Sequence, residues 1–153
     1  MMRDTKAISK DVLQQSKILL CTHIHSLIFG VNKHDFIPID KGTLTEGKVF
    51  CYDPENICRR YFDDRNSVNR LLLHSLLHCV LFHPFDTDFK DPELWNISCD
   101  IAVEYIINKW SISCTASEKS GLQNNLIKEM LNTEKHMTAE NIYYKLLSED
   151  RSA

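Results

Sequence analysis

Three histidines stand within ten residues of one another in this chain: His74, His78 and His83. Residues four apart on an α-helix lie on one face, so the imidazoles of His74 and His78 can reach the same ion. Zinc hydrolases use a helical H-x-x-x-H pair of this kind. The spacing therefore predicts a metal site. The alternative is that the two rings are hydrogen-bonded members of an apolar core.

Two residues are candidates for the third metal ligand. His83 would point away from the other two histidines on an unbroken helix, but Pro84 disfavours helical geometry at position 83. We therefore expect the helix to stop near Phe82, which allows His83 to turn back toward the pair. Asp100, on the next predicted helix, could bind the ion directly or accept a hydrogen bond from a ligand histidine. The sequence leaves both choices open.

Asp100 belongs to a polar stripe along its predicted helix. The stripe repeats every four residues and consists of Asn96, Asp100, Glu104 and Asn108. A stripe of this spacing lies along one helix face, and that face commonly contacts solvent. We expect Glu104 and Asn108 to be solvated, whereas Asp100 can point inward, toward the histidines.

The residue after the first histidine decides whether such a site can hydrolyse a peptide bond. In zinc peptidases it is a glutamate, which takes a proton from the attacking water and passes it to the leaving amine. This chain has Ser75 there, and a hydroxyl cannot act as a base at neutral pH. Glu93, near the start of the helix that carries Asp100, is a candidate replacement base. Without a replacement, we expect peptidase activity to be lost or very weak.

The periodicity of apolar residues predicts a mainly helical chain. Helices are expected over residues 8–29, from Asn66 or Ser67 to about Phe82, from Pro92 to about Trp110, and from Thr138 onward. The third of these has a strong start signal, Asp91-Pro92-Glu93, in which a capping carboxylate precedes a proline.

Residues between the first two helices follow a different period. Short strands are expected at 36–38 and 42–52, with a turn at Glu46-Gly47, and Pro38 restricts its strand to a sheet edge. Asp53-Pro54 is expected to close the second strand, and residues 111–121 are expected to form a loop. The predicted fold class is α+β, mainly α, in a single domain over residues 1–153.

Composition excludes several classes of protein. The 153 residues include 18 Lys and Arg and 21 Asp and Glu, a net charge of −3 that argues against nucleic acid as the main partner. No apolar stretch approaches the roughly 18 residues that span a bilayer, and the polar N-terminus lacks the apolar core of a secretion signal. The six cysteines include no C-x-x-C pair, so we expect reduced thiols in a cytoplasmic protein that contacts no membrane.

These residues resemble the pattern of a known family, the putative metallopeptidase domain that precedes a VWA-like domain in many bacterial proteins. The family pattern H-E-x-x-H-x-x-x-x-H is matched at His74, His78 and His83. The segment D-P-E-L-W-N-I-S-C-D at 91–100 resembles the acidic-led stretch that follows it. Residues 44–54 resemble the strand pair that precedes the metal helix, and residues 138–146 resemble the closing helix. The similarity spans most of the chain in the right order.

The resemblance implies a zincin-like helical domain with a small β-sheet or hairpin. It implies one Zn²⁺ ion bound by His74, His78 and either His83 or Asp100, and a peptide or protein substrate. Ser75 departs from the family pattern, so the implied domain is a peptidase-like pseudoenzyme with a degenerate H-S-x-x-H motif. The alternative is a non-catalytic interaction module that works with a VWA-like domain or a MoxR-type ATPase partner.

Overall fold

The described part of the chain is mainly helical and contains one small sheet. The computed structural model describes residues 4–25, 35–45, 49–85, 91–117 and 137–150. Its elements, in chain order, are α1 (Thr5–His23), β1 (Asp35–Pro38), β2 (Thr43–Thr45), β3 (Val49–Tyr52), α3 (Pro54–Asp63), α4 (Arg65–Val80), the 3₁₀ turn η2 (His83–Phe85), α5 (Pro92–Trp110), the 3₁₀ turn η3 (Ser113–Thr115) and α7 (Ala139–Asp150). The predicted fold class, α+β and mainly α, is confirmed.

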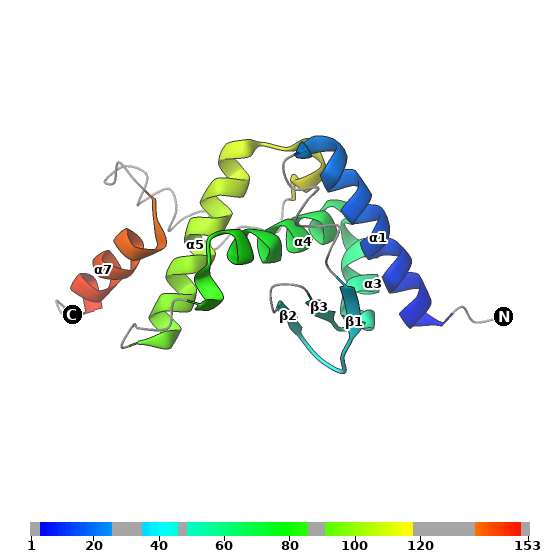
Figure 1. The fold of residues 1–153 in the computed structure, drawn as a ribbon, viewed down its shortest axis with the longest axis horizontal. Coiled ribbons are helices and arrows are strands. Elements are labelled where there is room, and N and C mark those ends of the chain that lie inside the picture. The colour runs from blue at the N-terminus through cyan, green and yellow to red at the C-terminus, as the bar shows by residue number, and fades with distance from the viewer. Residues whose placement is uncertain (1–3, 26–34, 46–48, 86–90, 118–136, 151–153) are drawn as a thin grey trace.

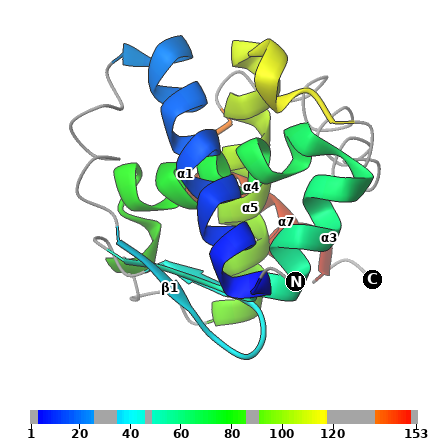
Figure 2. The same cartoon turned by 90° about the vertical axis from the view of Figure 1, so that its right-hand side faces the viewer.

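Helix α4 occupies the middle of the molecule (Figure 1). Helices α1 and α3 pack together and against α4, α5 also packs against α4, and α7 covers the outer side of α5 (Figure 1). Seen from the side of α1, the sheet lies beneath the helices (Figure 2). None of the described helices combines the length and the apolar character that crossing a bilayer requires.

The sheet has the strand order β1-β3-β2, with β1 parallel and β2 antiparallel to the central β3. Pro38 therefore lies in an edge strand, as predicted, because proline has no N–H to donate to a second neighbour. Along β3 the buried residues alternate, and Phe50 and Tyr52 face the core. The predicted turn at Glu46-Gly47 lies outside the described residues. Strand β2 forms the other edge, and it contacts α4.

Two clusters of buried side chains hold the helices in place, and α5 contributes to both. The larger cluster joins α1, the sheet, α3 and α4, and Val103 and Ile107 of α5 belong to it. The smaller cluster joins α5 to α7, and Trp95 and Ile101 belong to it. Burial on two sides fixes the rotation of α5 about its axis, and this rotation decides which α5 residues face α4.

Helix boundaries follow capping signals in the sequence. In α5 the Leu94 N–H donates to Oδ1 of Asp91 over 3.0 Å, and Pro92 takes the first helical position, as predicted. Helix α4 begins at Arg65, slightly earlier than predicted, because Asp64 provides the cap. It ends at Val80, two residues before the predicted Phe82.

Helix α3 is the one described helix of ordinary length that the apolar pattern did not predict. It begins with the same signal as α5, since Asp53-Pro54-Glu55 repeats Asp91-Pro92-Glu93. The Glu55 N–H donates to Oδ1 of Asp53 over 2.9 Å. Asp53 thus both follows strand β3 and caps helix α3, whereas only the first of these roles was predicted.

The remaining predictions concern the first and last helices, the loop at 111–121 and the cysteines. The first helix was predicted over 8–29, but α1 runs from Thr5 to His23, and the proposed end near Gly30 lies outside the described residues. The final helix begins next to Thr138, as predicted. The loop at 111–121 contains the short turn η3 in its described part. All six cysteines are free thiols, as predicted.

Candidate metal centre

Helices α4 and α5 bring two imidazoles and one carboxylate together. Nε2 of His74 and Nε2 of His78 lie 2.9 Å apart. Oδ1 of Asp100 lies 3.3 Å from the first nitrogen and 3.1 Å from the second. Within the described parts of the chain, this is the one cluster of His, Cys, Asp and Glu side chains whose donor atoms could share an ion. Of the two candidate third ligands, Asp100 is the one that faces both imidazoles.

The spacing of these three donor atoms fits a tetrahedral metal ion. Zinc bonds of about 2.0–2.1 Å place any two ligands of a tetrahedral site about 3.3–3.4 Å apart. The observed separations of 2.9, 3.1 and 3.3 Å require each pair to open by only a few tenths of an ångström at most. Two imidazole nitrogens and one carboxylate oxygen also form a donor set that catalytic zinc sites use. The residues present therefore fit a metal ion.

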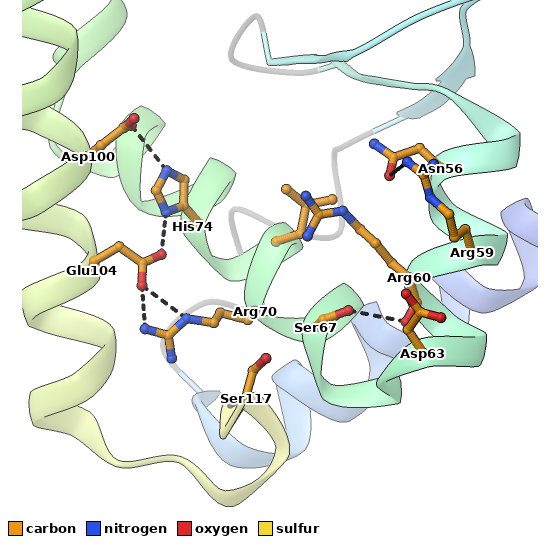
Figure 3. A pocket seen from close by; sticks show the side chains of 11 residues that line it. Asn56, Arg59, Arg60, Asp63, Ser67, Arg70, His74, Asp100, Glu104 and Ser117 are labelled. Atoms are coloured by element: carbon orange, nitrogen blue, oxygen red, sulfur yellow. Dashed lines mark hydrogen bonds and ion pairs between the residues drawn. The ribbon is translucent and has the colours of Figure 1, made fainter. Parts of the chain in front are cut away.

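The two helices meet along matched stripes of polar residues. On α4 the stripe is Arg70, His74 and His78, and on α5 it is Asp100, Glu104 and Asn108. The two stripes pair in opposite chain directions, so that residue numbers rise along α4 as they fall along α5. Arg70 contacts Asn108 at 2.7 Å, His74 contacts Glu104 at 2.8 Å, and His78 contacts Asp100 at 3.1 Å. Each step of one turn along α4 is thus matched by a step of one turn along α5, and Figure 3 shows this for Arg70 and His74 opposite Glu104 and Asp100.

Glu104 was expected to be solvated, and this prediction is wrong. The residue is 5% exposed, and its Oε1 accepts a hydrogen bond from Nδ1–H of His74 over 2.8 Å. Its Oε2 accepts from Nε of Arg70 over 3.0 Å and also from Nη2 of that arginine (Figure 3). A buried carboxylate needs such partners. The helix face of Glu104 is buried because α4 covers it, whereas Asn108, one turn further, is exposed as expected.

This hydrogen bond fixes the tautomer of His74. A proton on Nδ1, donated to Glu104, leaves Nε2 with the lone pair that a metal ion requires. In the metal-free protein, burial opposes the charged imidazolium, but hydrogen bonds to Asp100 and Glu104 outweigh burial and raise the pKa of His74 to about 9. Burial likewise opposes ionisation of Asp100 and Glu104, yet hydrogen bonds from the histidines and Arg70 lower the pKa of both carboxyl groups.

His83 reaches the site from behind His78. After α4 ends, Phe82 takes a left-handed conformation (φ 60°), and the chain turns into η2. This reversal places Nδ1 of His83 at 3.2 Å from Nδ1 of His78. The expectation that His83 turns back toward the pair is confirmed, but its nitrogen faces the side of His78 opposite to Nε2. Burial and the charge of His78 lower the pKa of His83 to about 4.

His74 and His78 both line a cleft of about 470 Å³. We call it the strand-side cleft, because β2 forms one wall and α4, η2 and α5 form the others; its lining includes Thr43, Thr45, Ser75, His83 and Asn96. Ser75 is thus at the cleft, but its Oγ–H donates to the Leu71 carbonyl over 3.1 Å. A fourth metal position directed into this cleft would be open to a substrate.

Glu93 lies apart from the histidines. It is exposed in the first turn of α5, and it lines neither the strand-side cleft nor the cleft around Arg70. Asp100 follows it by seven residues, which is two helical turns or roughly 10 Å along the axis. The structure therefore does not bring Glu93 together with the other candidate site residues.

Sequence reasoning missed the roles of Glu104 and Arg70. A signal was present, because Arg70 precedes His74 by four residues and Glu104 follows Asp100 by four. Two polar stripes on neighbouring apolar helices are expected to pair with each other rather than face solvent. The sequence did not show that these two helices are neighbours.

Comparisons with known proteins agree with the geometry. The family model described as a putative metallopeptidase domain matches residues 5–153, nearly the whole chain. No curated protein and no solved structure gives a match. The paired imidazoles, their carboxylate partner and this match over almost the full length show that the chain belongs to the putative metallopeptidase domain family.

Proposed function

We propose that this domain binds one zinc ion through Nε2 of His74, Nε2 of His78 and Oδ1 of Asp100. The observation that carries the proposal is the triangle of these three atoms, with sides of 2.9, 3.1 and 3.3 Å. Because all three residues line the strand-side cleft, a fourth coordination position open to that cleft would admit a peptide carbonyl or water.

The choice of zinc rests on the donor atoms. Two imidazole nitrogens disfavour Mg²⁺ and Ca²⁺, which take oxygen ligands, and they suit zinc. The donor set of two histidines and one carboxylate also occurs in non-haem iron(II) enzymes. The family match to a metallopeptidase domain favours zinc, and a measurement of metal content must therefore include iron.

Two residues behind the ligands orient the imidazoles. Glu104 accepts the Nδ1 proton of His74, and a neutral His83 can accept the Nδ1 proton of His78. Such outer partners fix ring orientation and raise ligand basicity. We assign His83 this outer role, and we assign Asp100 the role of third ligand.

Ser75 limits what the site can catalyse. Bound zinc polarises a substrate carbonyl and acidifies water, which is the chemistry that peptide hydrolysis uses. The Ser75 hydroxyl cannot remove a proton at neutral pH, and it is already hydrogen-bonded to the Leu71 carbonyl. Loss of a general base lowers a rate by about 10²–10⁴-fold. We infer a domain that retains metal and peptide binding but hydrolyses peptides very slowly or not at all.

Strand β2 is the wall of the cleft best suited to a peptide. The Asp53 N–H donates to the Gly42 carbonyl over 3.0 Å, so the alternation of an antiparallel ladder turns the backbone groups of Thr43 and Thr45 away from β3. An extended peptide can pair with such an edge. A peptide bound there runs past the three proposed zinc ligands, which share the same cleft.

Elemental analysis tests the zinc site. The protein, purified without added metal and without chelators, is expected to contain about one equivalent of zinc. His78→Ala and Asp100→Ala are expected to lose it, whereas Glu93→Gln, which removes an exposed carboxylate of the same helix, is expected to keep it. Equal metal content in wild type and His78→Ala would refute the proposal. Iron in place of zinc would refute the choice of metal.

Ser75 also favours a second candidate function, a zinc-stabilised interaction module without catalysis. In that case the strand-side cleft binds a peptide segment of a partner protein without cleaving it, and the partner is a VWA-like domain or a MoxR-type ATPase. A Ser75→Glu variant separates the two candidates. Peptidase activity that appears only in this variant supports a degenerate peptidase site, whereas its absence, with zinc bound, supports the interaction module.

A further inference from the structure

A second cleft, of about 490 Å³, adjoins the proposed zinc ligands His74 and Asp100. We call it the arginine cleft, because Arg59 and Arg60 of α3 and Arg70 of α4 line it (Figure 3). It shares Leu71, His74 and Asp100 with the strand-side cleft. The two clefts therefore meet at the proposed zinc site, and a ligand bound along β2 can extend past the ion into the arginine cleft.

The three guanidinium groups differ in how they are engaged. Arg70 pairs with Glu104 and also donates to Asn108. Within the described residues, neither Arg59 nor Arg60 forms an ion pair; the Arg59 guanidinium has one neutral contact, to Oδ1 of Asn56 over 3.3 Å. Arg60 extends from α3 across the cleft toward the helix that carries His74 (Figure 3). Both arginines of α3 are therefore available to an anion.

The acidic residues on the walls do not cancel these two charges. Glu104 is directed at His74 and Arg70, and Asp100 is directed at the two histidines. Asp63 is the third acidic residue among the described lining of the cleft, so the two arginines of α3 outnumber the acidic residue on their own helix. Zinc at the adjacent site would add further positive charge to the same cleft. The cleft is thus suited to a negatively charged group on a ligand.

We propose that the arginine cleft binds a carboxylate of the peptide whose backbone contacts the zinc site. This proposal rests on the proposed function, since it adds a substrate class to that same site. A guanidinium group forms a planar fork that matches a carboxylate with two parallel hydrogen bonds. The carboxylate comes either from the free C-terminus or from an acidic side chain. In both cases the N-terminal part of the peptide lies along β2 and the charged end lies between α3 and α4.

The test measures binding, because hydrolysis is expected to be weak. The probes are three pools of fluorescein-labelled random hexapeptides that lack internal acidic residues. The first pool has a free C-terminus, the second a C-terminal amide, and the third a glutamate followed by a C-terminal amide. Fluorescence polarisation gives the dissociation constant of each pool for the zinc-loaded protein.

We compare wild type with Arg59→Gln/Arg60→Gln and with a matched control. The control, Lys6→Gln/Lys10→Gln, removes the same two charges from exposed positions on α1, outside both clefts. Wild type and control are expected to bind a carboxylate-bearing pool about tenfold or more tightly than the amide pool. The arginine variant is expected to lose this preference. A preference for the first pool identifies the C-terminus as the source, and a preference for the third identifies a side chain.

Three results would overturn the inference. They are equal binding of all pools to the zinc-loaded wild type, no binding of any pool, and a carboxylate preference that survives in the arginine variant. Zinc content, measured on the same samples, distinguishes this failure from failure of the proposed function. Bound zinc with equal binding of all pools refutes only the arginine cleft, and bound zinc without any peptide binding also refutes peptide binding at the zinc site. Absence of zinc from the wild type refutes both proposals.

Discussion

Nδ1 of His74 lies 2.8 Å from Oε1 of Glu104, on the side of the imidazole opposite to the proposed zinc ligand atom. Glu104 also forms an ion pair with Arg70, so Arg70, Glu104 and His74 are linked in a row between α4 and α5. This arrangement orients His74 before any metal binds. With zinc bound as proposed, the affinity for the ion would depend on Glu104, a residue that is not one of the three proposed ligands.

The first prediction concerns Glu104. Glu104→Gln keeps the shape of the side chain but removes the charge that holds the Nδ1 proton of His74. Loss of an outer partner typically weakens metal affinity about 10–100-fold, and we expect a loss of that size. Competition with a zinc-binding dye measures it. Asn108→Ala, which removes a contact of Arg70 but none of His74, is expected to bind zinc like wild type. Equal affinity in wild type and Glu104→Gln would show that the carboxylate does not orient a ligand.

The second prediction separates Asp100 from His83. If Asp100 is a ligand and His83 is an outer partner, Asp100→Ala must weaken zinc binding more than His83→Ala, for which we expect a loss of about 10–100-fold. Cobalt substitution gives an independent reading, because the visible spectrum of Co²⁺ responds to the number and type of its ligands. The spectrum is expected to change in Asp100→Ala and to persist in His83→Ala. The reverse pattern would make His83 the third ligand.

The third prediction is an alkaline loss of stability in the metal-free protein. Carboxylate partners raise the pKa of His74 from 6.5 to about 9 against the opposing effect of burial. The folded state therefore holds this proton more tightly than the unfolded state, and the contribution to stability is complete below about pH 6.5. It is lost as the pH rises through about 9. Melting temperatures between pH 6 and pH 10, in the presence of a chelator, are expected to decline over this range.

A matched variant identifies the group responsible for that decline. His74→Asn keeps a hydrogen-bond donor but cannot titrate, so its melting temperature is expected to change less between pH 7 and pH 10 than that of wild type. The carboxyl groups act at the other end of the range: because the pKa of Asp100 and that of Glu104 are lowered, their contribution is lost as the pH falls below about 4. A wild-type melting temperature that rises between pH 7 and pH 9.5 would contradict the assignment.

The fourth prediction concerns Ser75. It lines the strand-side cleft next to His74, and a glutamate there can reach water in that cleft. If the site is a degenerate peptidase, Ser75→Glu is expected to raise the rate of peptide cleavage about 10²–10⁴-fold over wild type. A quenched-fluorescence peptide library measures the rate. Ser75→Gln controls for size and must stay at the wild-type level. Strong wild-type activity that disappears in Glu93→Gln would instead support a relocated base.

Much of the local structure follows from the sequence alone. The apolar pattern and the signal Asp91-Pro92-Glu93 give α5 its start, and Pro84 gives α4 an end within a few residues. The same signal at Asp53-Pro54-Glu55 starts α3, a helix of only 10 residues in which Pro54 and Ile57 are buried. These features are predictable because capping and proline sterics act over only three or four neighbouring residues.

The sequence by itself determined that His74 and His78 share a helix face, that Ser75 replaces the expected base, and that Asp100 and Glu104 lie on one stripe. Only the tertiary structure decided that this stripe faces the histidines, which buries Glu104 and directs Asp100 at the Nε2 atoms of both histidines. The physical reason is that helical periodicity fixes positions within one helix, whereas the rotation of a helix toward its neighbour depends on packing. Here that rotation is set by the two core clusters on either side of α5.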